Sequence, residues 1–257
     1  MRRARDVLRV GLAGVAFVGF GVGALLLSWL VLPVISLLAR RLDRRRRRCQ
    51  QVVRTAFGLF HDGMRLAGLV EFNHRTALTV PPRGPAVLIA NHPTLIDVTA
   101  LVSALGPICY LAKRSLFHNP LIGPLLRLCG QIPSGGRTLA GNVGSLNEAL
   151  DRLQRGHSVL LFPEGTRSPA GGLHTFRRGA FELARRAGVP VIPIVIRAEP
   201  PGLYRGLAWY EIPSRPIVID MEILDPISAT VATPTLASDL IRRRLGLPAN
   251  GEPAARR

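Results

Sequence analysis

The chain has 257 residues, of which 47% are apolar and 19% are charged, a composition that excludes a disordered protein. Its length suits one large domain or a domain with an appendage, and an odd number of cysteines, three, argues against a secreted disulfide scaffold. The net charge is +18, and residues 1–48 carry half of it, as 11 Arg against 2 Asp. Because these arginines flank the most apolar segment of the chain, the positive charge indicates binding to a membrane surface with anionic lipids rather than to a nucleic acid.

The N-terminal segment, residues 1–48, is predicted to be a retained membrane anchor. No residue from Val10 to Ala39 is charged, and a helix over that range would be about 45 Å long, more than the hydrocarbon core of about 30 Å. The heavier arginine cluster follows the apolar run, which predicts a protein of the cytoplasmic membrane with its remaining chain on the cytoplasmic side. Basic flanks on both sides, Pro33 and five glycines leave two geometries open, a spanning helix and a kinked helical hairpin in one leaflet.

Residues 49–69 have the apolar periodicity of an amphipathic helix, which would lie along the membrane or pack on the body of the protein. Short apolar runs then alternate with helical patterns as far as residue 250. The helical patterns cover residues 143–153 and 178–187, and the runs that we interpret as buried strands are Ala86–Ala90, Ile108–Ala112, Ser158–Phe162, Val191–Ile196 and Ile217–Glu222. Over residues 70–250 this alternation predicts an α/β domain with a mostly buried mixed sheet flanked by helices, and residues 251–257 are expected to be a frayed tail.

A first polar cluster follows the strand predicted at residues 86–90. It contains His92 and, five residues later, Asp97, at the end of a buried strand where open α/β sheets place their sites. A helix that begins at Thr94 would put the two side chains one turn apart, so that the carboxylate binds one imidazole nitrogen and the other is free to act as a base. The spacing alone is equally compatible with a histidine that caps a helix and an aspartate that holds a loop.

A second polar cluster follows the strand predicted at residues 158–162. Glu164, Gly165, Thr166 and Arg167 stand together in this turn, and an arginine guanidinium can bind a phosphate through two parallel hydrogen bonds. A surface turn with an Arg–Glu ion pair is the structural alternative. Further cations that could contact an anion lie at Arg137, after a Gly-rich turn, and at Arg177, two residues before Gly179 at the start of a predicted helix.

Several other chemistries lack their sequence signatures. There is no G-x-S-x-G nucleophile elbow, P-loop or G-x-G-x-x-G fingerprint. Cys49, Cys109 and Cys129 are far apart in the sequence and are expected to be buried thiols, and no His, Cys or Asp grouping has metal-ligand spacing. Neither a metal nor another cofactor is therefore expected. Nucleic acid is not expected as a partner either, because aromatic residues do not alternate with the arginines.

Four motifs in the same order resemble the glycerolipid (lysophospholipid) acyltransferase family, of which 1-acylglycerol-3-phosphate acyltransferase is the type member. The H-x4-D motif corresponds to His92 and Asp97, and the F-P-E-G-T-R-S motif is present in full at residues 162–168. The F-K-x-G element appears as F-R-R-G at residues 176–179, and the late V-P-V-I-P-V block resembles residues 189–194. The resemblance covers about residues 70–200.

The resemblance implies an O-acyltransferase that needs no covalent acyl-enzyme. His92 would be the general base, held by Asp97, and the second cluster with Arg177 and Gly179 would bind the acceptor. The donor would be a fatty acyl thioester, acyl-CoA or acyl carrier protein, and the acceptor a lysophospholipid such as 1-acylglycerol-3-phosphate. The family's second block ends in Asp-Arg, whereas here it is one residue longer and ends at Arg137 without the Asp.

Two alternatives to this acceptor and this activity stay open. Because the second block differs from the family's pattern, the acceptor could instead be another lipid, a lyso-ornithine or aryl-polyene-type lipid. A membrane-anchored basic binding protein without catalysis is the non-enzymatic alternative, and it would leave both polar clusters unexplained. Condensation-type acyltransferases are disfavoured, because they carry a doubled His and a Gly after the Asp, whereas here Asn91 precedes His92 and Val98 follows Asp97.

Overall fold

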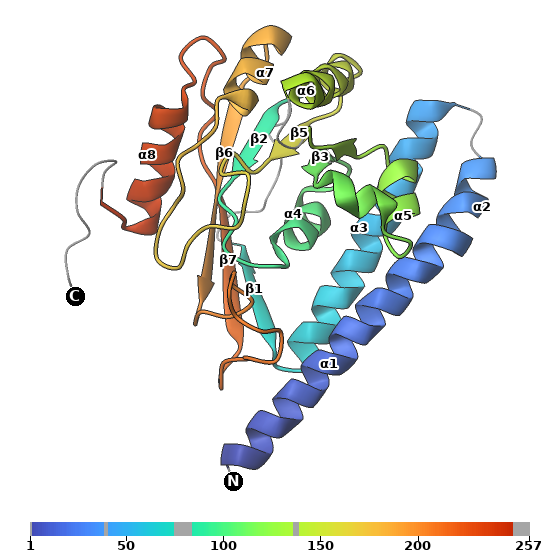
Figure 1. Ribbon diagram of the computed structural model, residues 1–257, viewed down its shortest axis with the longest axis vertical. Coiled ribbons are helices and arrows are strands. Elements are labelled where there is room, and N and C mark those ends of the chain that lie inside the picture. Colours follow the sequence, from blue (N-terminus) through green and yellow to red (C-terminus); the bar gives the residue numbers. More distant parts are fainter. Residues whose placement is uncertain (1, 39–40, 75–83, 136–138, 249–257) are drawn as a thin grey trace.

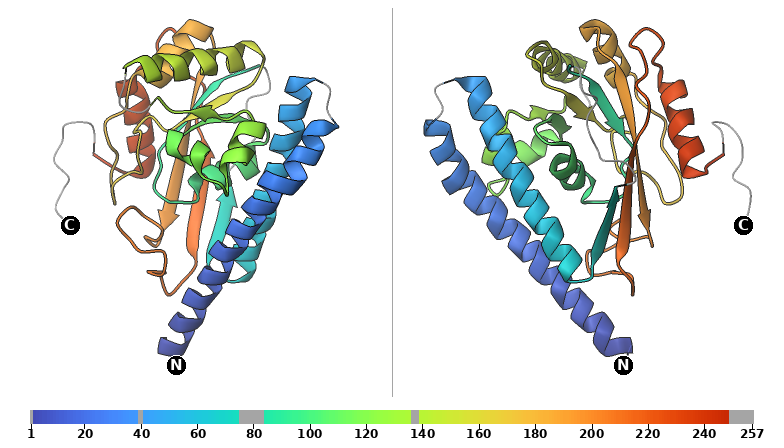
Figure 2. Two further views of the ribbon diagram at one scale, coloured as in Figure 1. Left: turned by 45° about the vertical axis from the view of Figure 1, so that its right-hand side comes forward. Right: turned by 180° about the vertical axis from the view of Figure 1, so that it is seen from behind.

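The computed structural model describes residues 2–38, 41–74, 84–135 and 139–248. A central sheet carries helices on both faces, and two long antiparallel helical segments run along one side of the molecule (Figure 1). The C-terminal helix α8 (Pro234–Leu245) lies on the opposite side of the sheet from those segments (Figure 2).

The N-terminal segment is one long, slightly irregular helix followed by a second. Helix α1 (Arg2–Leu26) continues through a π-helical turn (Leu27–Val31) into α2 (Leu32–Leu37). The irregular turn directly precedes Pro33, whose nitrogen cannot donate to the helical hydrogen-bond ladder. Residues Val7–Leu37 are long and apolar enough to cross a membrane by length and composition.

Helix α3 (Leu42–Leu66) packs antiparallel against α1, with Phe20 between Phe57 and Phe60 at ring-centroid distances of 6.2 and 5.1 Å. The amphipathic helix predicted over residues 49–69 is present, but it begins earlier, at Leu42. The arginine run at residues 44–48 therefore belongs to the same helix as residues 49–66. The predicted boundary between residues 48 and 49 falls inside this helix.

Within the described residues the sheet has seven strands, in the order β1-β7-β6-β2-β5-β3-β4. Only β6 and β7 pair antiparallel, so the sheet is mixed, as predicted. The five predicted strands are all present, whereas β1 and the two-residue β4 were not predicted. The strands are β1 (Val70–His74), β2 (Val87–Ala90), β3 (Cys109–Ala112), β4 (Ile132–Pro133), β5 (Val159–Leu161), β6 (Val191–Glu199) and β7 (Ile217–Ile223).

The helices of the domain cover the two faces of the sheet as two separate hydrophobic layers. Helices α4 (Asp97–Leu105) and α5 (Gly123–Leu128) pack with α1 and α3 on one face, and α6 (Leu139–Gln154), α7 (Gly179–Ala187) and α8 pack on the other. Strand β2 is fully buried and alternates between these layers, with Leu88 on the α3–α4 face and Ile89 on the α6–α8 face. Helices α6 and α7 confirm the two predicted helical patterns.

Candidate active site

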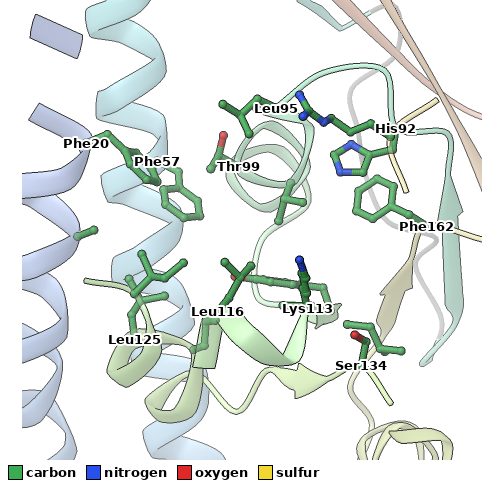
Figure 3. A pocket seen from close by; sticks show the side chains of 18 of the residues that line it. Phe20, Phe57, His92, Leu95, Thr99, Lys113, Leu116, Leu125, Ser134 and Phe162 are labelled. Carbon is green, nitrogen blue, oxygen red and sulfur yellow. The ribbon is translucent and has the colours of Figure 1, made fainter. Parts of the chain in front are cut away.

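Three parallel strands end beside one cavity. Strands β2, β5 and β3 are neighbours and run in the same direction, so their carboxyl ends lie at the same edge of the sheet. His92 follows β2, Phe162 follows β5 and Lys113 follows β3, and all three residues line a cavity of about 1520 Å³. In Figure 3 these residues lie on one side of the cavity, and Phe20 and Phe57 lie on the other.

His92 and Asp97 form the hydrogen-bonded pair that the sequence predicted. The His92 Nδ1 atom lies 2.7 Å from Asp97 Oδ2, and the Asp97 side chain is fully buried, while that of His92 is 19% exposed. Asp97 also accepts hydrogen bonds from the backbone N–H and the hydroxyl of Thr94. Helix α4 begins at Asp97, not at Thr94 as expected, because Thr94 belongs to the turn that the carboxylate closes.

This pairing determines which nitrogen of His92 can accept a proton. A carboxylate accepts hydrogen bonds only, so the proton resides on Nδ1 and the lone pair on Nε2. The imidazole also stacks on Phe162, with ring centroids 4.2 Å apart and an interplanar angle of 27°. His92 is therefore oriented by two contacts, and as a lining residue of the cavity it is placed to act as a base there.

The backbone around His92 is tied to neighbouring strands. Asn91 is buried, and its side chain both donates to the carbonyl of Ile196 and accepts from its N–H, at 2.7 and 2.8 Å. The Ser168 N–H donates to the His92 carbonyl at 2.7 Å, and the His92 N–H donates to the Ser168 hydroxyl at 3.0 Å. The backbone of Asn91 and His92, which follow β2, is thus held by hydrogen bonds to β6 and to the turn that follows β5.

Glu164 is buried beneath these contacts. Its Oε1 atom accepts from the Ser168 hydroxyl at 2.5 Å and from the His92 N–H at 3.3 Å, and its Oε2 atom accepts from the His174 N–H at 2.8 Å. Both carboxylate oxygens have protein donors, and Glu164 is not among the residues that line the cavity. Its geometry suits a positioning residue for the His92 backbone better than the substrate contact that the resemblance implied.

Gly165 and Arg177, predicted to act together at an anion, are in direct contact. Gly165 has φ +70°, a conformation that favours glycine, and a Cβ atom at this position would lie 2.7 Å from Cζ of Arg177. The backbone N–H of Arg177 donates to the carbonyl of Pro163 at 2.9 Å. The glycine thus allows the guanidinium to lie close over the turn, and both residues line the cavity.

Thr166 and Arg167 continue the same wall of the cavity. Arg167 Nη1 donates to the carbonyl of Leu203 at 3.2 Å, and Arg205 donates to the Thr166 hydroxyl at 2.9 Å. Arg205 also lines the cavity. Together with Arg177 and Lys113, these arginines form a cationic rim of the cavity that His92 also lines, a suitable environment for an anionic head group.

The apolar part of the cavity extends away from His92 between the helices. It is lined by side chains of α1, α3, α4 and α5, and Tyr110 of β3 also contributes. Burial raises the pKa of Tyr110, so this phenol stays neutral. Burial and the neighbouring charge of Asp97 likewise raise the pKa of Tyr204, whose hydroxyl donates to the carbonyl of Ala198.

The remaining predicted residues are distributed as follows. Gly179 lines the cavity at the start of α7, whereas Arg137 lies outside the described residues. The three cysteines are free and buried as predicted, and burial raises the pKa of each thiol.

Five residues that shape the site had no role predicted from the sequence. Two of them, Phe162 and Ser168, belong to a motif recognised in the sequence, and Thr94 lies between His92 and Asp97. Their positions within motifs could therefore have pointed to a role in the site. Lys113 follows a predicted strand directly, which is a weaker signal of the same kind. Arg205 lies beyond every motif.

The segment that contains this site is similar to known proteins. Residues 71–197 match the sequence model of the family described as Acyltransferase. The chloroplastic 1-acyl-sn-glycerol-3-phosphate acyltransferase LPAT1 of Arabidopsis thaliana is 36% identical over 112 residues, which are 44% of this chain and 32% of that protein. The 1-acyl-sn-glycerol-3-phosphate acyltransferase of Escherichia coli is 39% identical over 117 residues, 44% of this chain and 47% of that one.

The chain thus spans less than half of the length of these relatives, 32% of one and 47% of the other. A crystal structure of PlsC, the 1-acyl-sn-glycerophosphate acyltransferase from Thermotoga maritima, has the same fold, with a TM-score of 0.75 at 19% identity over 96% of this chain and 97% of that chain. Residues 71–197 hold the His92–Asp97 pair and the turn from Phe162 to Ser168, and this segment of the chain therefore carries the acyltransferase domain of that family.

Proposed function

We propose that the protein transfers a fatty acyl group from a thioester donor, acyl-CoA or acyl carrier protein, to a hydroxyl of a lysophospholipid of the 1-acylglycerol-3-phosphate type. The single observation that carries this proposal is the His92–Asp97 hydrogen bond of 2.7 Å at the wall of a cavity that combines a cationic rim with an apolar interior. The named activity of the relatives in the same family adds support.

In the proposed reaction His92 is the catalytic base. Its Nε2 atom takes the proton of the acceptor hydroxyl while the oxygen attacks the thioester carbonyl. The C–S bond then breaks, the thiolate leaves and receives the proton from the imidazolium, and an ester has formed. Asp97 stabilises the imidazolium during these steps through its hydrogen bond with Nδ1.

The two parts of the cavity suit the two parts of a lipid substrate. Its volume of about 1520 Å³ exceeds the range of about 300–1,000 Å³ typical of small-molecule sites, and the walls formed by α1, α3 and α5 are apolar. We assign the acyl chain to this apolar part. We assign the anionic head group to Arg167 and Arg177, with Gly165, Thr166 and Gly179 completing the wall.

The contacts of the N-terminal helix favour an anchor that lies in one leaflet over one that spans the bilayer. Arg9 donates to the carbonyl of Pro213 at 3.0 Å, and Trp29 donates to the carbonyl of Pro120 at 2.9 Å. These residues are about 30 Å apart along a helix, a distance equal to the hydrocarbon thickness, yet both ends contact the α/β domain. A helix that crossed the bilayer would separate these contacts. The arginine flanks support attachment to anionic lipids on the cytoplasmic side.

The proposal is tested with membranes that carry the full-length protein. They are incubated with labelled acyl-CoA or acyl carrier protein, each combined with 1-acylglycerol-3-phosphate, lyso-ornithine lipid and other lyso-lipids, and products are identified by mass spectrometry. We expect an ester of 1-acylglycerol-3-phosphate. A product from another lyso-lipid alone would transfer the proposal to that acceptor. The absence of any product from folded protein would leave the non-enzymatic alternative.

Replacing Arg167 tests the assignment of the head group. Losing a charge-assisted contact costs about 1.5–3 kcal/mol, so Arg167→Ala should raise the KM for the lyso-lipid about 10- to 150-fold, with little change in the KM for the donor. Arg167→Lys should also be impaired, because the planar fork is lost. Arg178→Ala is the matched control, since Arg178 is exposed and absent from the cavity wall. A rise in the donor's KM alone would show that Arg167 binds the donor.

Glu164→Gln tests the positioning role proposed for Glu164. An amide must turn its NH₂ group toward one of the three donors that surround the carboxylate, so we expect the free energy of unfolding to fall by about 1–3 kcal/mol. The shift of the His92 backbone should lower kcat about tenfold and leave the acceptor's KM nearly unchanged. Stability is measured by denaturant unfolding alongside steady-state kinetics.

Glu182→Gln provides the control for this variant, because Glu182 lies on the surface of α7 and pairs with the exposed Arg185 and Arg186. That substitution should leave the free energy of unfolding close to that of the wild type, because exposed ion pairs contribute little to stability. A Glu164→Gln protein of normal stability with a raised acceptor KM would contradict the positioning role and favour direct substrate binding.

A further inference from the structure

The connection between β6 and β7 is far longer than the turn requires. These two strands pair antiparallel, and such neighbours need only about two to five residues to reverse the chain, yet residues 200–216 join them. Connections longer than about 12–15 residues usually have a function of their own. We call residues 200–216 the β6–β7 loop, and it lies beyond the segment matched by the family.

The first half of the β6–β7 loop is fixed to the active site. The carbonyl of Leu203 accepts from the N–H of Leu95 at 3.1 Å and from Arg167 at 3.2 Å. Leu203 is buried and has φ +58°, the one left-handed non-glycine residue among the described residues. A non-glycine residue keeps a left-handed backbone conformation only where the contacts around it are strong enough to hold it there. This half of the loop therefore moves with the two turns that form the site.

The second half of the loop exposes three large apolar or aromatic side chains in four positions. Leu207, Trp209 and Tyr210 are 41%, 50% and 54% exposed. Trp209 and Tyr210 meet edge to face, with ring centroids 5.6 Å apart. Adjacent exposed side chains of this size mark an interaction surface more strongly than scattered ones do.

This surface is continuous with the apolar face of α1. The Trp209 ring meets Phe17 at a centroid distance of 6.2 Å, and a Cβ atom on Gly14 would lie 3.7 Å from it. One turn after Gly14, on the same side of the helix, Val18 is 67% exposed. The exposed face of α1 further includes Val7, Leu8, Val15, Val22, Leu25 and Leu26.

We propose that the tip of the β6–β7 loop, residues 207–210, is a second membrane contact that inserts into the lipid–water interface beside α1. Tryptophan and tyrosine prefer this interface because each combines an apolar ring with one polar group. Exposed Arg205 and Arg215 flank the tip and suit anionic head groups, and the only acidic residue of the loop, Glu211, binds the N–H of Ala208. The proposal rests on the membrane association proposed above.

This contact has a consequence for the entry of substrate. The loop connects the interface, at Trp209, with the cationic rim of the cavity, where Arg205 binds Thr166. Insertion of the tip would hold the mouth of the cavity at the level of the head groups. A lyso-lipid could then move from the leaflet into the site without leaving the membrane.

The two tryptophans of the chain, Trp29 and Trp209, allow a direct test. The Trp29→Phe variant reports on the β6–β7 loop, and the Trp209→Phe variant reports on the anchor. Each full-length variant is reconstituted in phosphatidylcholine–phosphatidylglycerol vesicles with or without phosphatidylcholine brominated at a shallow or a deep acyl position. We expect quenching of Trp209 by the shallow bromines at least about twofold stronger than by the deep ones.

The possible outcomes distinguish a failure of the proposed loop contact from a failure of the proposed membrane association. Quenching of Trp29 without quenching of Trp209 overturns the loop contact and leaves the anchor in place. If neither tryptophan is quenched, the proposed membrane association itself fails. A Trp209 that is protected from aqueous acrylamide but not quenched by bromolipid indicates a protein partner or a second copy, which also overturns the lipid contact.

A charge placed on the loop tip gives a functional measurement. Tyr210→Glu should weaken the quenching of Trp209 and raise the apparent KM for vesicle-borne lyso-lipid about fivefold, the effect of one charge at an anionic surface. Val231→Glu is the matched control, because Val231 is similarly exposed, at 59%, and lies outside the β6–β7 loop, shortly before α8 in the sequence. Equal behaviour of the two variants would contradict the proposal.

Discussion

We expect the His92→Ala variant to lose about 10²- to 10⁴-fold in kcat, the contribution of a positioned general base. No other described side chain on the cavity wall is both held by a carboxylate and left with a free imidazole nitrogen, so no neighbour can replace it. The loss should appear in kcat with little change in either KM, because the base acts in the transition state and contributes little to ground-state binding. Initial rates at saturating donor and acceptor measure it.

His118→Ala is the matched control for this experiment. His118 is exposed, ends a 3₁₀ turn and is not part of the cavity wall, so its loss should leave kcat within about twofold. The fold of His92→Ala is checked by circular dichroism and thermal unfolding. A folded His92→Ala protein with wild-type turnover would exclude the proposed mechanism.

Four of the five strands that the sequence predicted, β2, β3, β5 and β6, are buried along most of their length, whereas β7 is buried mainly on one face. Strand β2, for example, is a continuous apolar run because helices cover both sides of it. Strand β1 (Val70–His74) escaped prediction because it is an edge strand that pairs with β7 alone and alternates apolar with polar residues. Strand β4 comprises only two residues, too few to produce a periodic signal.

Helix α8 was missed although its ends carry recognisable signals. The Thr233 hydroxyl accepts from the N–H of Leu236, Pro234 occupies the first turn, and Gly246 ends the helix in a left-handed conformation. For the N-terminal segment the sequence left a spanning helix and a hairpin open. Composition could not distinguish them, because the contacts on which we base the proposal of an anchor in one leaflet, such as Arg9 with Pro213, join residues far apart in the sequence.

Contacts within one motif of the candidate site could be predicted from the sequence, whereas contacts between two motifs could not. The His92–Asp97 pair is only five residues apart, so its hydrogen bond was one of two interpretations that the spacing allowed, and the resemblance to a motif favoured it. The burial of Glu164 beneath the backbone of His92 depends on two turns after different strands, and residue types alone suggested an anion site for both Glu164 and Arg167. The structure separates their environments, because Arg167 lines the cavity and Glu164 does not.

The Asp97→Ala variant should lose about as much activity as His92→Ala, 10²- to 10⁴-fold in kcat. Asp97 is the common acceptor of His92 Nδ1–H and of both Thr94 donors. Without it the imidazole is free to carry its proton on either nitrogen and to rotate, and no charge stabilises the imidazolium. Buried donors left without an acceptor also cost about 1–3 kcal/mol each, so Asp97→Ala is expected to be less stable, which thermal unfolding will show.

Asp97→Asn separates the catalytic loss from the loss of stability. Of the three donors, only the Thr94 hydroxyl can rotate to accept a hydrogen bond, so the new NH₂ group should occupy the Oδ1 position. The amide oxygen then still accepts from Nδ1–H and keeps the tautomer, while the negative charge that stabilises the imidazolium is lost. We therefore expect kcat between wild type and Asp97→Ala, reduced about 10- to 100-fold, in a protein of nearly normal stability. If Asp97→Asn retained full activity, the charge would have no part in catalysis and Asp97 would serve only to orient His92.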